Sequence, residues 1–175
     1  MAVWHWIFRL FCHQIPDRSP SYEAVVFPIC FRCAGLYGQL LFTYAFLALR
    51  GGLRWRFPGM RLALAVASLT AGLMFDGWAN WLQLWNTPPL MRALTGLAAG
   101  AAIPILLLPL AGRHAPAAPD SRAIAWPVCA GLAFLWMLAR PVSQAQFQLL
   151  ALACTLGLGC LLANLWFACR ALRDR

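Results

Sequence analysis

Long apolar stretches separated by short polar or proline-rich segments dominate this chain. Apolar stretches of about 17 to 25 residues are typical of membrane-spanning helices. The segments between them combine Gly, Pro and Arg, as in RGGLRWRFPGMR (50–61) and AGRHAPAAPDSR (111–122), and these end a helix. The pattern predicts an all-α, polytopic transmembrane helical bundle of about five spans, over residues 33–49, 62–85, 93–110, 123–139 and 147–169. Small residues in LTGLAAGAA and LGLGC predict close helix packing.

The first residues, MAVWHWIFRLF, are apolar but too few to cross a bilayer. They lack the basic start and the small-residue cleavage site of a signal peptide, so we expect no cleavable leader. We interpret them as a short N-terminal interfacial or re-entrant helix. The length of the chain suits a single integral membrane domain over residues 1–175.

Composition places the chain in the membrane class. It is 62% hydrophobic and 11% charged, whereas soluble domains are about 45–50% apolar and about 25% charged. All 14 basic residues are arginines, against five acids, which gives a formal charge of +9. No soluble basic domain presents these arginines, so we interpret them as topology signals and lipid contacts. The predicted partner is membrane lipid rather than nucleic acid, with a membrane protein complex or a homo-oligomer as a further expectation.

The distribution of arginine predicts an orientation. The 50–61 loop, the 111–122 loop and the tail after residue 169 hold nine arginines, and the segments that alternate with them hold five. Because cytoplasmic loops are enriched in Arg and Lys, we expect the C-terminus in the cytoplasm. The cysteine-bearing N-terminal stretch is then extracytoplasmic, and the expected location is the bacterial cytoplasmic (inner) membrane.

Alternation of the spans also brings polar residues together. Consecutive spans run in opposite directions. The start of the first span, the end of the second and the start of the third therefore lie at the same end of the bundle. Cys30, Cys33, Asp76 and Arg92 therefore fall at one end. This clustering does not depend on which side of the membrane that end faces.

The cysteines near the N-terminus indicate a metal site. One turn with Cys30-x2-Cys33 spacing can offer two thiolates to a tetrahedral ion such as zinc or another divalent transition metal. Cys12 and His13 are the obvious further ligands, and since neighbouring residues seldom bind one ion together, the favoured set is the three cysteines with His13 or Asp76. Arg32, between the paired thiols, favours thiolates. A redox or structural disulfide and inert thiols are the alternatives.

Asp76 is the most unusual single residue. A carboxylate inside an apolar span is costly and normally faces a partner in the bundle. The nearest candidates are Arg92, Arg18 and a metal ion, and Asn80 shares its helix face. An ion pair with Arg92 and a role as base or ligand are both consistent with the sequence. Asp76, Arg18 and Arg92 form the predicted catalytic set, in which the arginines attract an anionic group such as a lipid phosphate.

The stretch CHQIPDRS also fits the Cys-x5-Arg-Ser spacing of cysteine-dependent phosphatases. That loop needs glycines and free amides to cradle phosphate, whereas Pro16 removes an amide and no glycine is present. This spacing therefore does not predict a phosphatase.

Four ordered elements, CHQIPDRS, FPICFRCAGLYGQ, FDGWANW and RALTGLAAG, resemble the prokaryotic membrane-protein family called domain of unknown function 2085. The resemblance implies a membrane protein with a shared polar site and a core over residues 12–110, followed by an extra helical hairpin over residues 123–170. Ala34 and Asn80 depart from the family pattern, which has Thr and Gln there. The matching residues are Cys12, His13, Gln14, Arg18, Ser19, Cys30, Arg32, Cys33, Gly35, Tyr37, Asp76, Gly77, Arg92, Thr95 and Gly96.

Three functional hypotheses follow. The first is a membrane protein whose Cys12, Cys30 and Cys33, with His13 or Asp76, hold a zinc-like ion and which binds or acts on an anionic lipid. The second is a thiol-disulfide redox protein that uses Cys30 and Cys33. The third is a non-catalytic accessory subunit of a membrane complex. Whether the protein is an enzyme is left open by the sequence.

Overall fold

The protein is almost entirely helical in a computed structural model that describes residues 2–23, 25–51, 59–111, 125–140 and 143–173. A short 3-10 turn (η1, Pro16–Arg18) and a small hairpin of β1 (Ser21–Tyr22) and β2 (Val25–Val26) precede the long helices. The prediction of an all-α bundle with a short N-terminal helix is confirmed. The helices are α1 (Ala2–Phe8), α2 (Phe31–Gly51), α3 (Met60–Trp81), α4 (Pro89–Ala111), α5 (Ala125–Ala139) and α6 (Gln144–Arg173).

Within the described residues, three helices are long and apolar enough to cross a membrane: α3, α4 over Pro89–Pro109, and α6. Helix α5 is apolar but shorter. Helix α2 has 21 residues, about 30 Å at the usual rise, but it carries the polar residues Arg32, Gln39 and Thr43. A count of five spans therefore stays a prediction for α2 and α5. Arg54, Arg56, Arg113, Arg122 and Arg175, on which the predicted orientation partly depends, lie outside the described residues.

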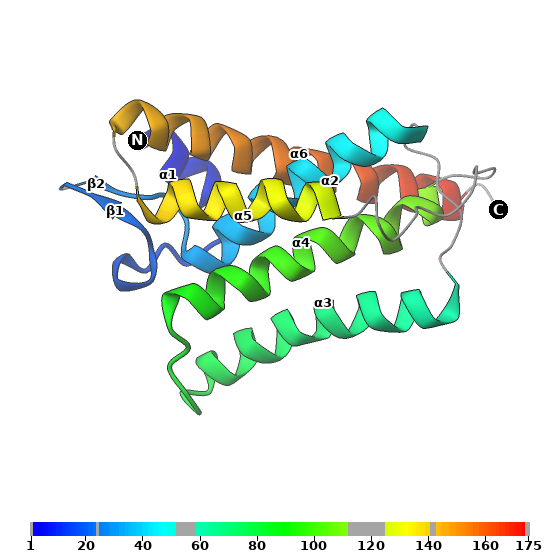
Figure 1. Ribbon diagram of the computed structural model, residues 1–175, viewed down its shortest axis with the longest axis horizontal. Helices are drawn as coiled ribbons and strands as arrows, with labels where there is room; N and C mark the ends of the chain where they lie inside the picture. The colour runs from blue at the N-terminus through cyan, green and yellow to red at the C-terminus, as the bar shows by residue number, and fades with distance from the viewer. Residues whose placement is uncertain (1, 24, 52–58, 112–124, 141–142, 174–175) are drawn as a thin grey trace.

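Helix α2 is the centre of the bundle. It packs against α4, α5 and α6, whereas α3 packs chiefly against α4 and forms one edge of the molecule (Figure 1). Along α2, Leu40 and Leu47 are buried in the apolar core, and Gln39 and Thr43 are buried beside them. Gln39 Nε2 donates to Thr43 Oγ1 and to the carbonyl of Pro127 in α5. These hydrogen bonds lower the cost of placing amide and hydroxyl groups in an apolar interior.

Glycines allow the backbones of neighbouring helices to approach closely. A Cβ at Gly96 of α4 would collide with the carbonyl oxygen of Arg32 in α2, and one at Gly157 of α6 would collide with that of Tyr37. In a lipid environment helices associate through such packing rather than through a hydrophobic driving force. The structure thus bears out the close packing expected from the small-residue stretches.

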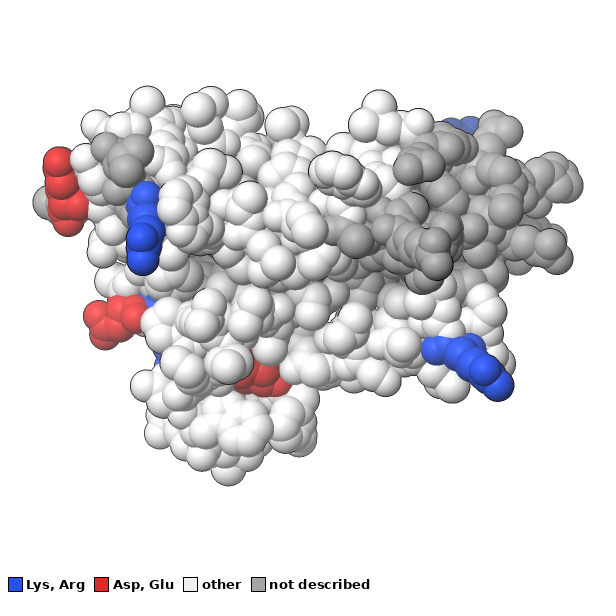
Figure 2. All heavy atoms as spheres, viewed as in Figure 1, with Lys and Arg blue, Asp and Glu red and all other residues white. Residues whose placement is uncertain are grey.

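One end of the bundle collects the polar segments. The start of α2, the end of α3 and the start of α4 all lie at the end that carries the β-hairpin, and the C-terminus lies at the other end (Figure 1). On the part of the face described in Figure 2, charged side chains gather towards the two ends, and the surface between them is almost uncharged. An uncharged band between charged ends is the arrangement that suits a bilayer.

Helix α3 ends at Trp81, four residues earlier than the sequence predicted. Gln83 has a φ of 56°, in the left-handed region that stops a helix. The following segment folds back, and the amide of Thr87 donates to Asn80 Oδ1 at 3.3 Å. Residues 82–85 therefore belong to the turn between α3 and α4.

Two glycines of α6 provide a test of this packing. Gly157→Ala should lower the free energy of unfolding by about 1 to 3 kcal/mol, because the new methyl group meets the α2 backbone. Gly159→Ala is the matched control, since nothing lies within 4 Å of the Cβ it adds. Thermal unfolding of both variants in the same detergent measures the difference, and equal melting temperatures would contradict the proposed packing.

Candidate functional site

Three thiols meet at the hairpin end of the bundle. Cys12 follows α1, Cys30 precedes α2 and Cys33 lies in the first turn of α2, and their Sγ atoms all lie within 4.8 Å of one another. Sulfurs around a tetrahedral zinc ion, each about 2.3 Å from it, are about 3.8 Å apart. Small side-chain movements would therefore bring these three sulfurs to ligand spacing.

The local fold explains why distant cysteines meet. The hairpin reverses the chain, with Ser21 paired to Val26, so that Cys30 returns to Cys12. The amide of Cys30 donates to Cys12 Sγ at 3.3 Å, and the amide of Cys12 donates to the carbonyl of Phe8 at 2.9 Å. The cluster is thus fixed by backbone hydrogen bonds on both sides.

Aromatic side chains enclose the thiols from the bundle side. Phe8 is fully buried and stacks on Tyr37, with ring centroids 6.0 Å apart.

Hydrogen bonds from the thiols of Cys12 and Cys33 hold the pKa of Cys30 well below its usual range, in spite of burial. A lowered pKa favours the thiolate, the form in which cysteine binds metals and attacks electrophiles.

His13 is exposed and is not part of this group. Asp76 also lies outside it, so within the described residues the group consists of three cysteine donors. The remaining cysteines are free as well and lie elsewhere in the bundle, with Cys154 buried and Cys169 exposed.

Asp76 pairs with Arg32, not with Arg92, Arg18 or a metal donor group. Arg32 Nε donates to Asp76 Oδ2 at 2.8 Å, Nη2 donates to the same oxygen, and the two residues form an ion pair. Arg32 crosses from the start of α2 to α3 beside Gly77, where a Cβ would lie 3.6 Å from Nη1. The partner is thus none of the three candidates that the sequence suggested for Asp76: spacing along the chain places both Arg32 and Arg92 at this end, but only the packed helices determine which one reaches the carboxylate.

The other oxygen of Asp76 is also occupied. Asn80 Nδ2 donates to Oδ1 at 3.0 Å and Thr87 Oγ1 donates to it at 2.5 Å, while Thr95 Oγ1 donates to Oδ2 at 3.3 Å. Asp76 is only 5% exposed. A carboxylate whose oxygens all accept hydrogen bonds is better suited to orienting its neighbours than to accepting a proton from a substrate.

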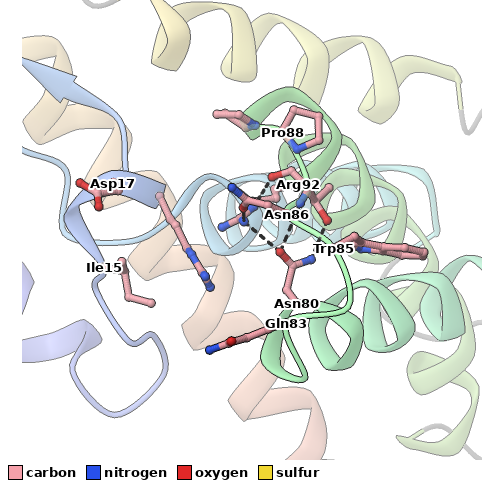
Figure 3. A pocket seen from close by; sticks show the side chains of 11 residues that line it. Ile15, Asp17, Asn80, Gln83, Trp85, Asn86, Pro88 and Arg92 are labelled. Atoms are coloured by element: carbon pink, nitrogen blue, oxygen red, sulfur yellow. Dashed lines mark hydrogen bonds between the residues drawn. The ribbon is translucent and has the colours of Figure 1, made fainter.

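Arg92 is buried, with 4% of its surface exposed, and has only neutral partners. Its Nε donates to the carbonyl of Thr87 at 2.7 Å, and its Nη2 donates to Asn80 Oδ1 at 2.9 Å and to Asn86 Oδ1 at 2.7 Å (Figure 3). Among the described residues, the ion pair between Arg32 and Asp76 is the only one. The charge of Arg92 is therefore not balanced by a carboxylate in direct contact.

A pocket of about 440 Å³ opens beside Arg92 (Figure 3). Its charged lining residues are Arg92, Arg18 and Asp17, and the last two belong to η1. The amides of Asn80, Gln83 and Asn86 line it too. The structure thus brings together the two predicted anion-attracting arginines from parts of the chain 74 residues apart by number. The sequence interpretation did not place Asn86 or Thr87 at the site, although the polar run NTPP that holds them is plain in the sequence.

Comparison with known proteins assigns the chain to a family. Residues 12–106 match the family described as "Predicted membrane protein (DUF2085)". The chain belongs to this family. The DUF2085 segment contains the three clustered cysteines, Arg32, Asp76 and Arg92, and it ends within α4. Helices α5 and α6 follow it.

One relative of this DUF2085 protein is an uncharacterized protein of the archaeon Methanothermobacter thermautotrophicus, strain Delta H. The two are 32% identical over 101 residues, which cover 57% of this chain and 86% of the relative. No solved structure matches the chain.

The ion pair between α2 and α3 can be tested by Asp76→Asn. We expect the free energy of unfolding to fall by about 3 kcal/mol, because the guanidinium of Arg32 is left without its counter-charge in a mostly buried position. Asp17→Asn is the control, since Asp17 is exposed and forms no ion pair within the described part of the chain. Denaturation in detergent compares them, and an unchanged stability of Asp76→Asn would contradict the structural importance of the pair.

Proposed function

We propose that this DUF2085 protein is an integral membrane protein with a zinc-like metal site formed by Cys12, Cys30 and Cys33, which binds or acts on an anionic membrane lipid. The observation that carries the proposal is the convergence of three thiols within 4.8 Å from separate segments. Thiolates are soft ligands that favour zinc and related ions, and the lowered pKa of Cys30 favours its thiolate form.

The number of donors decides what such a site can do. Three thiolates leave a fourth position to a water or a substrate, where a zinc-like ion supplies Lewis-acid chemistry. His13, beside Cys12 but exposed, could instead turn inward and complete a closed, structural site. The presence of three donors in the described group favours the open arrangement.

Arg18 and Arg92 support an anionic ligand, because both line the pocket at the same end of the bundle. Asp76 connects this pocket with the thiols: it holds Arg32, which separates Cys30 from Cys33, and it contacts Asn80, which accepts from Arg92. In this proposal Asp76 orients Arg32 directly and Arg92 through Asn80. Arg18 and Arg92 contact the ligand.

A thiol-disulfide redox function has one observation in its favour. Cys12, Cys30 and Cys33 are free and close together, and the pKa of Cys30 is lowered. A low-pKa thiol beside a second thiol is also the arrangement of a reactive dithiol. The redox function and the metal site predict different purified proteins. Disulfide formation lowers the mass by two hydrogens, and the oxidised protein holds no metal ion.

Elemental analysis of detergent-purified protein tests the metal site. We expect about one equivalent of zinc or a related transition metal in the wild type and a large loss in Cys33→Ser, since three-thiolate sites bind tightly at neutral pH. Cys169→Ser, which changes an exposed thiol away from the cluster, should retain the metal.

The same samples separate the alternatives. A wild type free of metal, two hydrogens lighter and alkylated at Cys30 and Cys33 only after reduction, would replace the metal proposal with the redox function. Metal-free, reduced protein that co-purifies with a larger membrane complex would support an accessory subunit instead.

We further propose that the protein resides in the bacterial cytoplasmic membrane, with the C-terminus cytoplasmic and the cysteine cluster extracytoplasmic. The placement of the C-terminus and of the hairpin at opposite ends of the bundle supports opposite sides for the two (Figure 1). A reporter that is active only in the cytoplasm, fused after Arg175, should be active, and one that is active only in the periplasm should not. The reverse result would invert the orientation.

A further inference from the structure

We propose that the pocket beside Arg92 binds the phosphodiester headgroup of an anionic glycerophospholipid, with Arg92 and Arg18 as its counter-charges. The inference rests on the proposed function only in that it specifies the anionic ligand. It does not require the thiol cluster to hold a metal.

Arg92 provides the first reason. The Arg92 guanidinium is 4% exposed, and its hydrogen-bond partners among the described residues are all neutral, so no carboxylate in direct contact balances its charge. Such charges are costly and normally have a partner of opposite sign. Its Nε and Nη2 are bonded to the protein, whereas Nη1 makes no hydrogen bond with the described residues and the side chain lines the pocket. A ligand oxyanion in the pocket would supply both the missing charge and the missing acceptor.

The charge of the pocket lining provides the second reason, because it specifies the class of anion. Arg92 and Arg18 contribute two positive charges and Asp17 one negative charge. The neighbouring charges of Arg32 and Asp76 cancel each other in their ion pair. The lining itself therefore carries one net positive charge, which a singly charged phosphodiester neutralises. A phosphomonoester, with about −1.5 to −2 at neutral pH, would leave excess negative charge.

The position of the pocket provides the third reason, because it favours a lipid over a soluble phosphate. The pocket lies between the end of α3 and the start of α4, two helices that are long and apolar enough to span a membrane. Lipid headgroups lie at the ends of such spans, and tryptophans such as Trp85, which lines the pocket, are typical of that level. On α3, the exposed ring of Phe75 packs edge-on against Trp85, with centroids 5.4 Å apart, and offers an apolar surface for acyl chains next to the pocket.

Native mass spectrometry of the purified full-length protein tests the proposal, with phosphatidylglycerol, phosphatidic acid and phosphatidylcholine of matched acyl chains as probes. Wild-type protein should retain one phosphatidylglycerol more tightly than either other lipid. Arg92→Gln should weaken it by about tenfold or more, the loss expected for a charge-assisted hydrogen bond. Arg61→Gln is the matched control, because it removes the same charge at the opposite end of α3.

Two further variants make the test specific. Arg18→Gln should also weaken phosphatidylglycerol binding, and it serves if Arg92→Gln does not fold, because Arg18 lies outside the hydrogen-bond network of Asp76. Asp17→Asn should shift the preference towards phosphatidic acid, because the lining then carries two uncompensated positive charges.

The outcomes are decisive in each arm. Equal retention of phosphatidylglycerol by wild type, Arg92→Gln and Arg18→Gln would overturn the site. Tighter binding of phosphatidic acid to the wild type would overturn the phosphodiester assignment, and displacement of the lipid by equimolar inorganic phosphate would overturn the lipid as its source. Metal content measured on the same samples keeps the two proposals apart: a metal-free wild type that binds phosphatidylglycerol refutes only the metal site.

Discussion

The ion pair between Arg32 and Asp76 is the interaction on which this end of the protein depends. It is the only ion pair among the described residues, and it joins the turn that spaces Cys30 from Cys33 to a helix that otherwise packs chiefly against α4. Asp76 is buried and Arg32 is mostly buried, so the pairing lowers the cost of placing each charge there. This contact therefore couples the position of the paired cysteines to the position of α3.

From this pair a continuous set of hydrogen bonds reaches the pocket. Asp76 accepts from Asn80 and Thr87, and these two in turn accept from Arg92. The network satisfies the polar groups that three helix ends bring into an apolar environment. Neutral groups hold Arg92 in place, but they do not compensate its charge. A negatively charged ligand in the pocket can do so. The thiol cluster and the pocket thus lie at the same polar end of the bundle but differ in chemistry. The cluster offers sulfur ligands, and the pocket offers positively charged hydrogen-bond donors.

Much of this architecture was predictable because it follows from local rules. Apolar stretches of spanning length predicted helices at α2 to α6 within a few residues, and their alternation predicted that the cysteines, Asp76 and Arg92 share one end. The end of α3 was missed because Gln83 adopts a left-handed conformation that no Gly or Pro announces. The partner of Asp76 was missed because several arginines lie at that end and helix alternation does not rank them. His13 was grouped with the thiols since it neighbours Cys12, but the chain leaves its side chain exposed.

The sequence by itself determined the class of the protein, the positions of its helices and the end at which its reactive residues gather, since hydrophobic periodicity and helix-breaking residues act over short stretches of chain. It also held the Cys-x2-Cys spacing and the isolated carboxylate that mark the site. Only the tertiary structure decided which residues touch. The hairpin returns Cys30 to Cys12, close glycine contacts set α2 against α4 and α6, and Arg32 rather than Arg92 reaches Asp76. These outcomes depend on the relative rotation and depth of packed helices, which short stretches of sequence do not specify.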